Sequence, residues 1–149
     1  AWVLDMPTPQ SVVAVAAGHR FARRRHLSIA DLVDEPLIVP DRRSRPHSHD
    51  LTLRLFEKAG MRPAIAQIAD EKQTIVRLVA SGIGLAIVPR WASKTALAGV
   101  RYIPFSDADL EGFRVLPLAV AWTRGTRDPN RDALLSVLTA GLETYRADA

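Results

Sequence analysis

The stretch Leu78-Val-Ala-Ser-Gly-Ile-Gly-Leu-Ala-Ile-Val-Pro89 joins the end of a predicted helix to a short apolar strand. Gly82 is of the residue type that most readily adopts the left-handed conformation at the end of a helix. Residues 85–88 form a short apolar run, as a buried strand does, and Pro89 ends it because proline has no N–H to donate to a sheet. The stretch therefore predicts a helix, a glycine turn and a buried strand in direct succession.

The helix that ends at Gly82 is predicted to begin at Asp70. Gln73 stands three residues after Asp70, which is the spacing of a capping box, where two side chains accept hydrogen bonds from free N–H groups of the first turn. The buried stripe of this helix consists of apolar residues at helical spacing: Ile75, Val76, Leu78 and Val79.

The rest of the chain alternates short apolar runs with amphipathic stretches. The other predicted strands are residues 11–17, 37–39, 64–68, 100–105 and 115–122. The other predicted helices start at Ser28, between Ser48 and Asp50, at Trp91 (ending at Ala98) and at Asp128 (ending near Tyr145). Because parallel strands need a connecting helix to return the chain, this alternation predicts an α/β fold with a mostly parallel central sheet flanked by helices and right-handed crossovers.

The composition is that of a globular domain, and it excludes several classes of protein. Of the 149 residues, 48% are apolar, 24% are charged and none is cysteine. A chain without cysteine has no thiolate catalysis, disulfides or Cys-based zinc sites, and it fits a reducing cytoplasm. The longest apolar run near the N-terminus, residues 12–17, is far shorter than the roughly 18 residues of a membrane span. We therefore expect a cytoplasmic domain with no signal peptide and no membrane anchor.

The positive charge is modest and falls in two short arginine clusters, residues 23–25 and 42–45. Lys and Arg number 20 and Asp and Glu 16, so the formal net charge is +4. DNA-binding domains usually concentrate basic residues on one recognition element, whereas both clusters lie in loop-like sequence. The charge alone therefore does not indicate a nucleic-acid-binding domain.

Two segments at the carboxyl ends of predicted strands carry the candidate ligand-binding residues. Ligands of open α/β sheets bind at this edge, where free N–H groups at helix starts and nearby cations attract an anion. The candidates are Pro40, Asp41, Arg42, Arg43, Ser44, Lys72 and Gln73. A competing interpretation remains open, in which acidic residues at the helix starts already cap them and pair with the arginines: Asp41, Asp50, Asp70 and Glu71.

Enzyme and metal motifs are not found in the sequence. His47 and His49 are two residues apart, a spacing that directs their imidazoles away from each other, and no further ligand lies at a suitable spacing. Gly82 and Gly84 follow a helix and precede a strand, the reverse of a dinucleotide-binding fingerprint, and there is no Gly-x-Ser-x-Gly. Trp91 and Trp122 are interpreted as packing residues of the core or of an edge rather than as base-stacking platforms. We expect no enzymatic activity, no bound metal and no cofactor.

The opening stretch, together with residues 71–74 before it, resembles the hallmark segment of the effector-binding domain of LysR-type transcriptional regulators. Further stretches agree with that family in order and spacing: residues 13–22, 32–38, 59–63, 99–104 and 118–122. The resemblance covers about residues 11–146, which is nearly the whole chain.

This resemblance implies a periplasmic-binding-protein-like fold of type II, whose two lobes enclose a small effector. By the same resemblance, residues 1–10 are the crossover from the first lobe, residues 11–123 are the second lobe, and residues 124–149 form a helix that returns to the first lobe. The chain then corresponds to a fragment without the helix-turn-helix and without most of the first lobe. The alternative function is a solute-binding protein of a transport system, because fold does not fix function.

The resemblance also implies the partners of the chain. Relatives hold the effector with the loop after the second strand of the second lobe and with the start of the next cleft helix, which are here Pro40–Ser44 and Lys72–Gln73. The expected effector is a small organic anion, with a carboxylate as the leading class. Promoter DNA would be bound only through the helix-turn-helix, and no membrane is involved. Self-association is expected through the apolar stripe of the last helix: Leu134, Leu135, Leu138, Leu142 and Tyr145.

Overall fold

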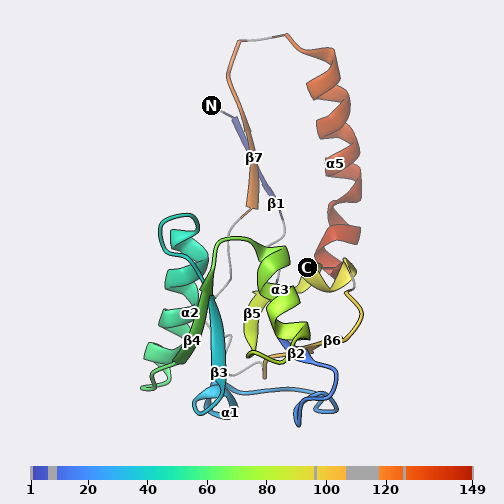
Figure 1. Ribbon diagram of the computed structural model, residues 1–149. Coiled ribbons are helices and arrows are strands. Elements are labelled where there is room, and N and C mark those ends of the chain that lie inside the picture. Colours follow the sequence, from blue (N-terminus) through green and yellow to red (C-terminus); the bar gives the residue numbers. More distant parts are fainter. Residues whose placement is uncertain (1, 7–9, 96, 107–117, 126, 149) are drawn as a thin grey trace.

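The computed structural model describes residues 2–6, 10–95, 97–106, 118–125 and 127–148 (Figure 1). Its strands are β1 (Trp2–Met6), β2 (Ser11–Ala16), β3 (Pro36–Pro40), β4 (Ala64–Ala69), β5 (Ala86–Pro89), β6 (Val100–Pro104) and β7 (Leu118–Trp122). Its helices are α1 (Ile29–Leu32), α2 (Pro46–Lys58), α3 (Lys72–Ala80), the 3₁₀ helix η1 (Arg90–Lys94) and α5 (Pro129–Asp148). No helix of the described segments has the length and apolar character needed to cross a membrane.

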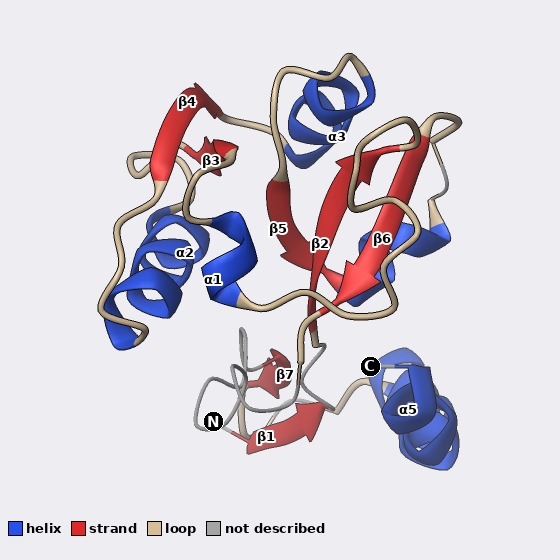
Figure 2. Ribbon diagram, turned by 90° about the horizontal axis from the view of Figure 1, so that it is seen from below, coloured by secondary structure: helices blue, strands red, loops and turns tan. Residues whose placement is uncertain are grey.

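The strands of the main body lie side by side in the order β4-β3-β5-β2-β6. β3 and β4 pair in parallel, and β2 pairs antiparallel with both β5 and β6. Two backbone hydrogen bonds of 2.8 Å join the halves: the Ile38 N–H donates to the Leu85 carbonyl, and the Leu85 N–H donates to the Pro36 carbonyl. Figure 2 shows α3 on one face of these strands and α1 and α2 on the other.

The expectation of a mostly parallel sheet is not confirmed, because β2 runs antiparallel to both of its neighbours. The connection after β2 returns the chain twice. Residues 17–27 follow β6, held by hydrogen bonds from the Ala17 N–H to the Gly99 carbonyl and from the Leu27 N–H to the Pro104 carbonyl. The segment containing α1 then leads back, so that β3 begins at the end of the sheet where β2 stops. The helical crossovers between parallel strands that the sequence pattern predicts occur between β3 and β4, through α2, and between β4 and β5, through α3.

The central strand β2 is buried on both faces. Val13 and Val15 belong to a core cluster with Leu32 and Phe56 of α1 and α2. Val12 and Ala14 belong to a second cluster with residues of α3, and this alternation assigns successive side chains to opposite layers. A strand covered on both sides reads as a continuous apolar run, which explains why the residue pattern predicts β2 correctly.

Two glycines of the opening stretch have distinct structural roles. Gly82 has φ +76° and follows the last turn of α3, as predicted. At Gly84, a Cβ atom would lie 2.5 Å from the Pro36 carbonyl oxygen. β3 and β5 can therefore approach each other closely at this point only because residue 84 has no side chain.

Two parts of the structure lie apart from the main sheet. β1 and β7 form an antiparallel pair, with Trp2 opposite Trp122. The first residues of the strand predicted over 115–122 lie outside the described segments. α5 extends away from the main body on the side where β1 and β7 lie, and its C-terminal end is the part nearest to the main body (Figure 1). Its apolar residues are poorly covered, and Val137 is 67% exposed.

Candidate functional site

A cavity of about 780 Å³ lies between α3, η1 and the start of α2. Its walls are formed by Arg45, Glu71, Lys72, Gln73, Val76, Arg77, Trp91, Ala92, Thr95 and Leu97. Among these residues three are cationic and one is acidic, so the cavity favours an anion. Of the candidates from the sequence, Lys72 and Gln73 line it, and the loop residues Pro40–Ser44 do not.

The start of α3 differs from the prediction. The N-cap residue is Glu71, not Asp70, and no side chain caps the helix, so the predicted capping box with Gln73 is wrong. The Asp70 carbonyl instead accepts a hydrogen bond from Nε of Arg45 at 2.8 Å. The N–H groups of the first turn, at Lys72 and Gln73, are thus left without a capping side chain beside the cavity, where they can bind an anionic group.

Lys72 lies at the centre of this arrangement. Its ammonium nitrogen is 3.5 Å from the centroid of the Trp91 ring, within the range of a cation–π interaction. Partial burial, followed by the nearby Arg45 charge, lowers the pKa of Lys72 to about 8. Both causes disfavour the charged form, and a bound anion would offset them by supplying a counter-charge.

Arg45 is a site residue that the sequence reasoning did not select. It is the N-cap residue of α2, which begins at Pro46, earlier than the predicted start between Ser48 and Asp50. Proline is common at the first position of a helix, so Pro46 was the signal that could have located this start. The correct start places Arg45, rather than the preceding arginines, at the cavity.

The loop Pro40–Ser44 is folded onto the beginning of α2. The Asp41 carbonyl accepts the Arg45 N–H at 2.8 Å, and the Asp41 N–H donates to the Ala69 carbonyl at 3.1 Å. The Pro40 carbonyl lies 2.8 Å from Nδ1 of His49, which donates to it. These bonds hold the loop against the end of β4 and the first turn of α2.

The two arginines of this loop are exposed and paired with acidic residues. Nε of Arg42 lies 3.6 Å from Asp50, and Nε of Arg43 lies 4.0 Å from Asp41. Such pairs are expected from the competing interpretation, in which acidic residues at the helix starts pair with the arginines. Exposed ion pairs contribute little free energy, so an effector can compete for these cations.

Trp91 was interpreted as a packing residue of the core or of an edge, and it does not lie in the core. Its side chain is 46% exposed and forms one wall of the cavity. The predicted helix over residues 91–98 is instead the short 3₁₀ helix η1, in which Ala92 is the buried residue. A five-residue segment has only one inward-facing position here, and Ala92 occupies it.

The histidines of α2 form no metal site within the described residues, where no group of three or more His, Cys, Asp or Glu side chains is suitably placed. His47 is exposed, and His49 holds the Pro40 carbonyl. Both residues lie in α2 rather than in the loop where the sequence reasoning placed them, because the helix already begins at Pro46.

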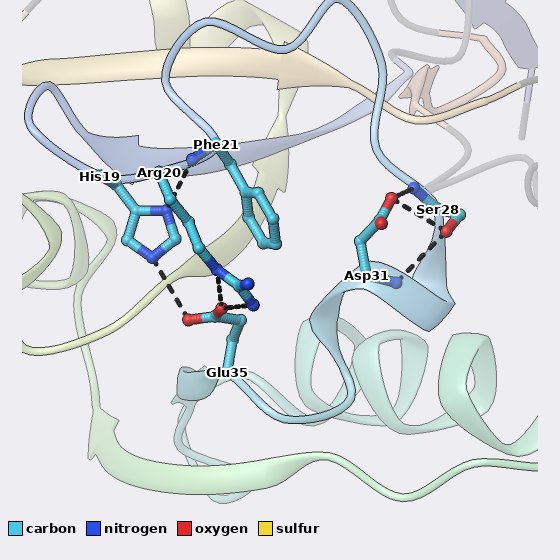
Figure 3. Close-up of polar contacts among 6 residues, drawn as sticks. All are labelled: His19, Arg20, Phe21, Ser28, Asp31 and Glu35. Carbon is cyan, nitrogen blue, oxygen red and sulfur yellow. Dashed lines mark hydrogen bonds and ion pairs between the residues drawn. The ribbon is translucent and has the colours of Figure 1, made fainter.

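A separate polar cluster stabilises the connection between β2 and β3 (Figure 3). The buried Glu35 carboxylate accepts a hydrogen bond from Nε of Arg20 at 2.8 Å and lies 3.2 Å from Nε2 of His19. Ser28 and Asp31 form a capping box at α1, and the backbone hydrogen bond from Ser28 lowers the pKa of Asp31. None of these residues lines the cavity, so we assign the cluster a structural role.

Comparison with known proteins identifies the fold. The structure of this chain is similar to the effector-binding domain of BenM with its effector benzoate (TM-score 0.73, 20% identity, covering 93% of this chain and 64% of that chain). It is also similar to the effector-binding domain of QuiR in complex with shikimate (TM-score 0.69, 22% identity, covering 95% of this chain and 66% of that chain). The predicted type II periplasmic-binding-protein-like fold is therefore confirmed.

Sequence comparison gives the family. The chain is 52% identical over 146 residues to the HTH-type transcriptional regulator TtuA of Agrobacterium vitis, covering 98% of this chain and 47% of that protein. The chain thus spans about half the length of the curated relatives it matches. These relatives are transcriptional regulators rather than enzymes. Residues 6–143 match the family model of the LysR substrate binding domain. The chain belongs to the LysR substrate binding domain family.

Proposed function

We propose that this chain is the effector-binding part of a transcriptional regulator and that it binds a small organic anion in the cavity at the start of α3. The observation that carries the proposal is the uncapped first turn of α3, which lies at a cavity lined by Arg45, Lys72 and Arg77. Backbone N–H groups at a helix start together with cationic side chains bind carboxylates and phosphates in many proteins.

A carboxylate is the leading chemical class for this anion. The two similar structures described above contain benzoate and shikimate, which are both carboxylates. A planar carboxylate can accept two hydrogen bonds at once, one from an N–H group of α3 and one from a cation. The loop Pro40–Ser44 is proposed to contribute from the other side, with Arg42 released from its exposed pair with Asp50.

The proposed mechanism is a shift of population between conformations. In it, residues 11–123 are the second lobe, residues 1–10 are the crossover and residues 124–149 return to the first lobe. An effector held between the lobes favours the closed arrangement and thereby changes the DNA affinity of a helix-turn-helix elsewhere in the regulator. The relatives are named as transcriptional regulators, which favours this function over solute transport.

The proposal is tested by recording ¹H–¹⁵N spectra of the chain during titration with benzoate and shikimate, with benzamide as the uncharged control for benzoate. Carboxylates bound as proposed shift the amide resonances of residues 72–74, and benzamide does not. If the carboxylates shift none of these resonances at millimolar concentration, or if benzamide shifts them equally, the anion site is wrong.

A further inference from the structure

The walls of the cavity combine cations with an apolar surface. Arg45, Lys72 and Arg77 supply the positive charge, and Val76, Ala92 and Leu97 supply aliphatic surface. Trp91 adds the largest apolar group of the lining. A site for a bare inorganic anion would need only the charged groups, because apolar walls contribute nothing to such a ligand.

Trp91 is held in an exposed position by its local backbone. It is the second residue of η1, which begins directly after Pro89, and the buried residue of η1 is its neighbour Ala92, which is 2% exposed. The indole therefore stays 46% exposed at the cavity. Leaving so much aromatic surface in water is unfavourable unless another group covers it.

The group that covers the ring in this structure is the Lys72 ammonium, 3.5 Å from the ring centroid. This nitrogen carries one of the positive charges that bind the anion in the proposed function. The same lysine can therefore serve either the indole face or the ligand head group, which links the two parts of the cavity.

We propose that Trp91 is a specificity-determining residue, whose indole face stacks on the flat or apolar body of the effector once the effector's anionic group has drawn the Lys72 ammonium off the ring. The inference rests on the proposed function, because it concerns the same cavity. The cavity would then bind organic anions with a flat unsaturated or apolar body in preference to small compact anions.

The energetics favour this exchange of partners. A charge-assisted hydrogen bond to a carboxylate is stronger than a cation–π contact at a partly exposed site. The charged groups lining the cavity around Lys72 are Glu71, Arg45 and Arg77. The nearby charge of Arg45 disfavours the charged form of Lys72, and an added anion would supply the counter-charge. The ring face that the ammonium leaves is then covered again by the ligand, so its apolar surface is not returned to water.

The test measures the affinities of benzoate and acetate by NMR titration for the wild-type chain and for Trp91→Ala, Trp91→Phe and Tyr145→Ala. Tyr145 is a matched control because it is an aromatic residue of α5 with similar exposure, 44%, outside the cavity. We expect Trp91→Ala to weaken benzoate binding about three- to tenfold, the range for one aromatic contact. Acetate binding should not weaken, because Trp91→Ala also removes the cation–π contact that Lys72 gives up when an anion binds. Trp91→Phe should restore most of the benzoate affinity, and Tyr145→Ala should have no effect.

The outcomes separate this inference from the proposed function. If both anions bind but Trp91→Ala leaves the benzoate-to-acetate ratio unchanged, the role of Trp91 is wrong and the anion site stands. If neither anion binds, the anion site and this inference fail together.

A second measurement follows the exchange directly in the wild-type chain. The Lys72 ammonium nitrogen lies over the indole, 3.5 Å from the ring centroid, so the ring current should shift the resonances of the neighbouring side-chain protons upfield in the free protein. Benzoate should move them toward the values of an ordinary lysine. A Lys72 side chain that keeps its upfield shift at saturating benzoate would overturn the proposal.

Discussion

Nε of Arg45 donates a hydrogen bond of 2.8 Å to the carbonyl oxygen of Asp70, although the two residues are far apart in the chain. Arg45 is the N-cap residue of α2, and Asp70 immediately precedes the N-cap residue of α3. The bond therefore ties together two helix starts at the same edge of the sheet. It also positions the guanidinium beside Lys72, where its charge contributes to the lowered pKa of that lysine.

The affinity of the cavity for benzoate should decrease as the pH rises through about 8. The pKa of Lys72 is lowered to about 8, so the free protein has a charged ammonium below this pH and loses it above. Since the anion binds the charged form, affinity falls by up to about tenfold per pH unit above 8 until the higher pKa of the complex is reached. Calorimetric titration between pH 6.5 and 9.5 measures this dependence. Lys72→Arg keeps its charge throughout, so an equally steep decrease in that variant would contradict the assignment.

Arg45→Ala should weaken carboxylate binding more than Arg42→Ala. Arg45 lines the cavity, whereas Arg42 is exposed and pairs with Asp50. Loss of a charge-assisted hydrogen bond costs about 1.5–3 kcal/mol, or roughly ten- to a hundredfold in affinity. The sequence reasoning selects Arg42 of the loop Pro40–Ser44. Comparing the two variants in one titration series therefore decides whether the carboxylate is bound mainly by this loop or by Arg45 at the start of α2. The exposed Arg25→Ala serves as the control for a general loss of positive charge.

Gly84→Ala should destabilise the chain by about 1–3 kcal/mol, the usual cost of overpacking. The added Cβ would lie 2.5 Å from the backbone oxygen of Pro36, which cannot move without disturbing the β3–β5 junction. Urea denaturation followed by circular dichroism gives the free energy of unfolding. Gly18→Ala is the matched control, because nothing lies within 4 Å of its added Cβ. Equal stability of the two variants would show that the close approach is not required.

The chain is expected to self-associate through the uncovered face of α5. Val137 is 67% exposed, and Leu134 on the same helix is also exposed. Burial of such apolar surface favours association. Light scattering should show a mass that increases with protein concentration, and Val137→Lys should reduce this increase. The control Thr139→Lys changes an exposed polar residue of the same helix. A monomeric mass over the whole concentration range would exclude this association.

The order of strands and helices from β2 onward was predictable because it depends on local signals, whereas no strand was predicted at β1. Gly82 and Pro89 mark the end of α3 and of β5, and the apolar run of β2 reflects burial on both faces. The resemblance to the LysR family, stated from residues 78–89, is confirmed by the match over residues 6–143. Such signals act over a few residues, so each can be recognised without knowing what the segment packs against.

The antiparallel direction of β2 and the composition of the cavity depend on tertiary structure. Residues 17–27 show no pattern of their own, and their course beside β6 is set by hydrogen bonds to Gly99 and Pro104, far along the chain. Sequence alone placed Lys72 and Gln73 at a helix start, because a strand followed by an amphipathic helix specifies that edge of the sheet. It could not place Arg45 or Trp91 beside them. Those contacts join α2, α3 and η1, and only the packing of the three elements on one sheet brings their side chains within reach of one another.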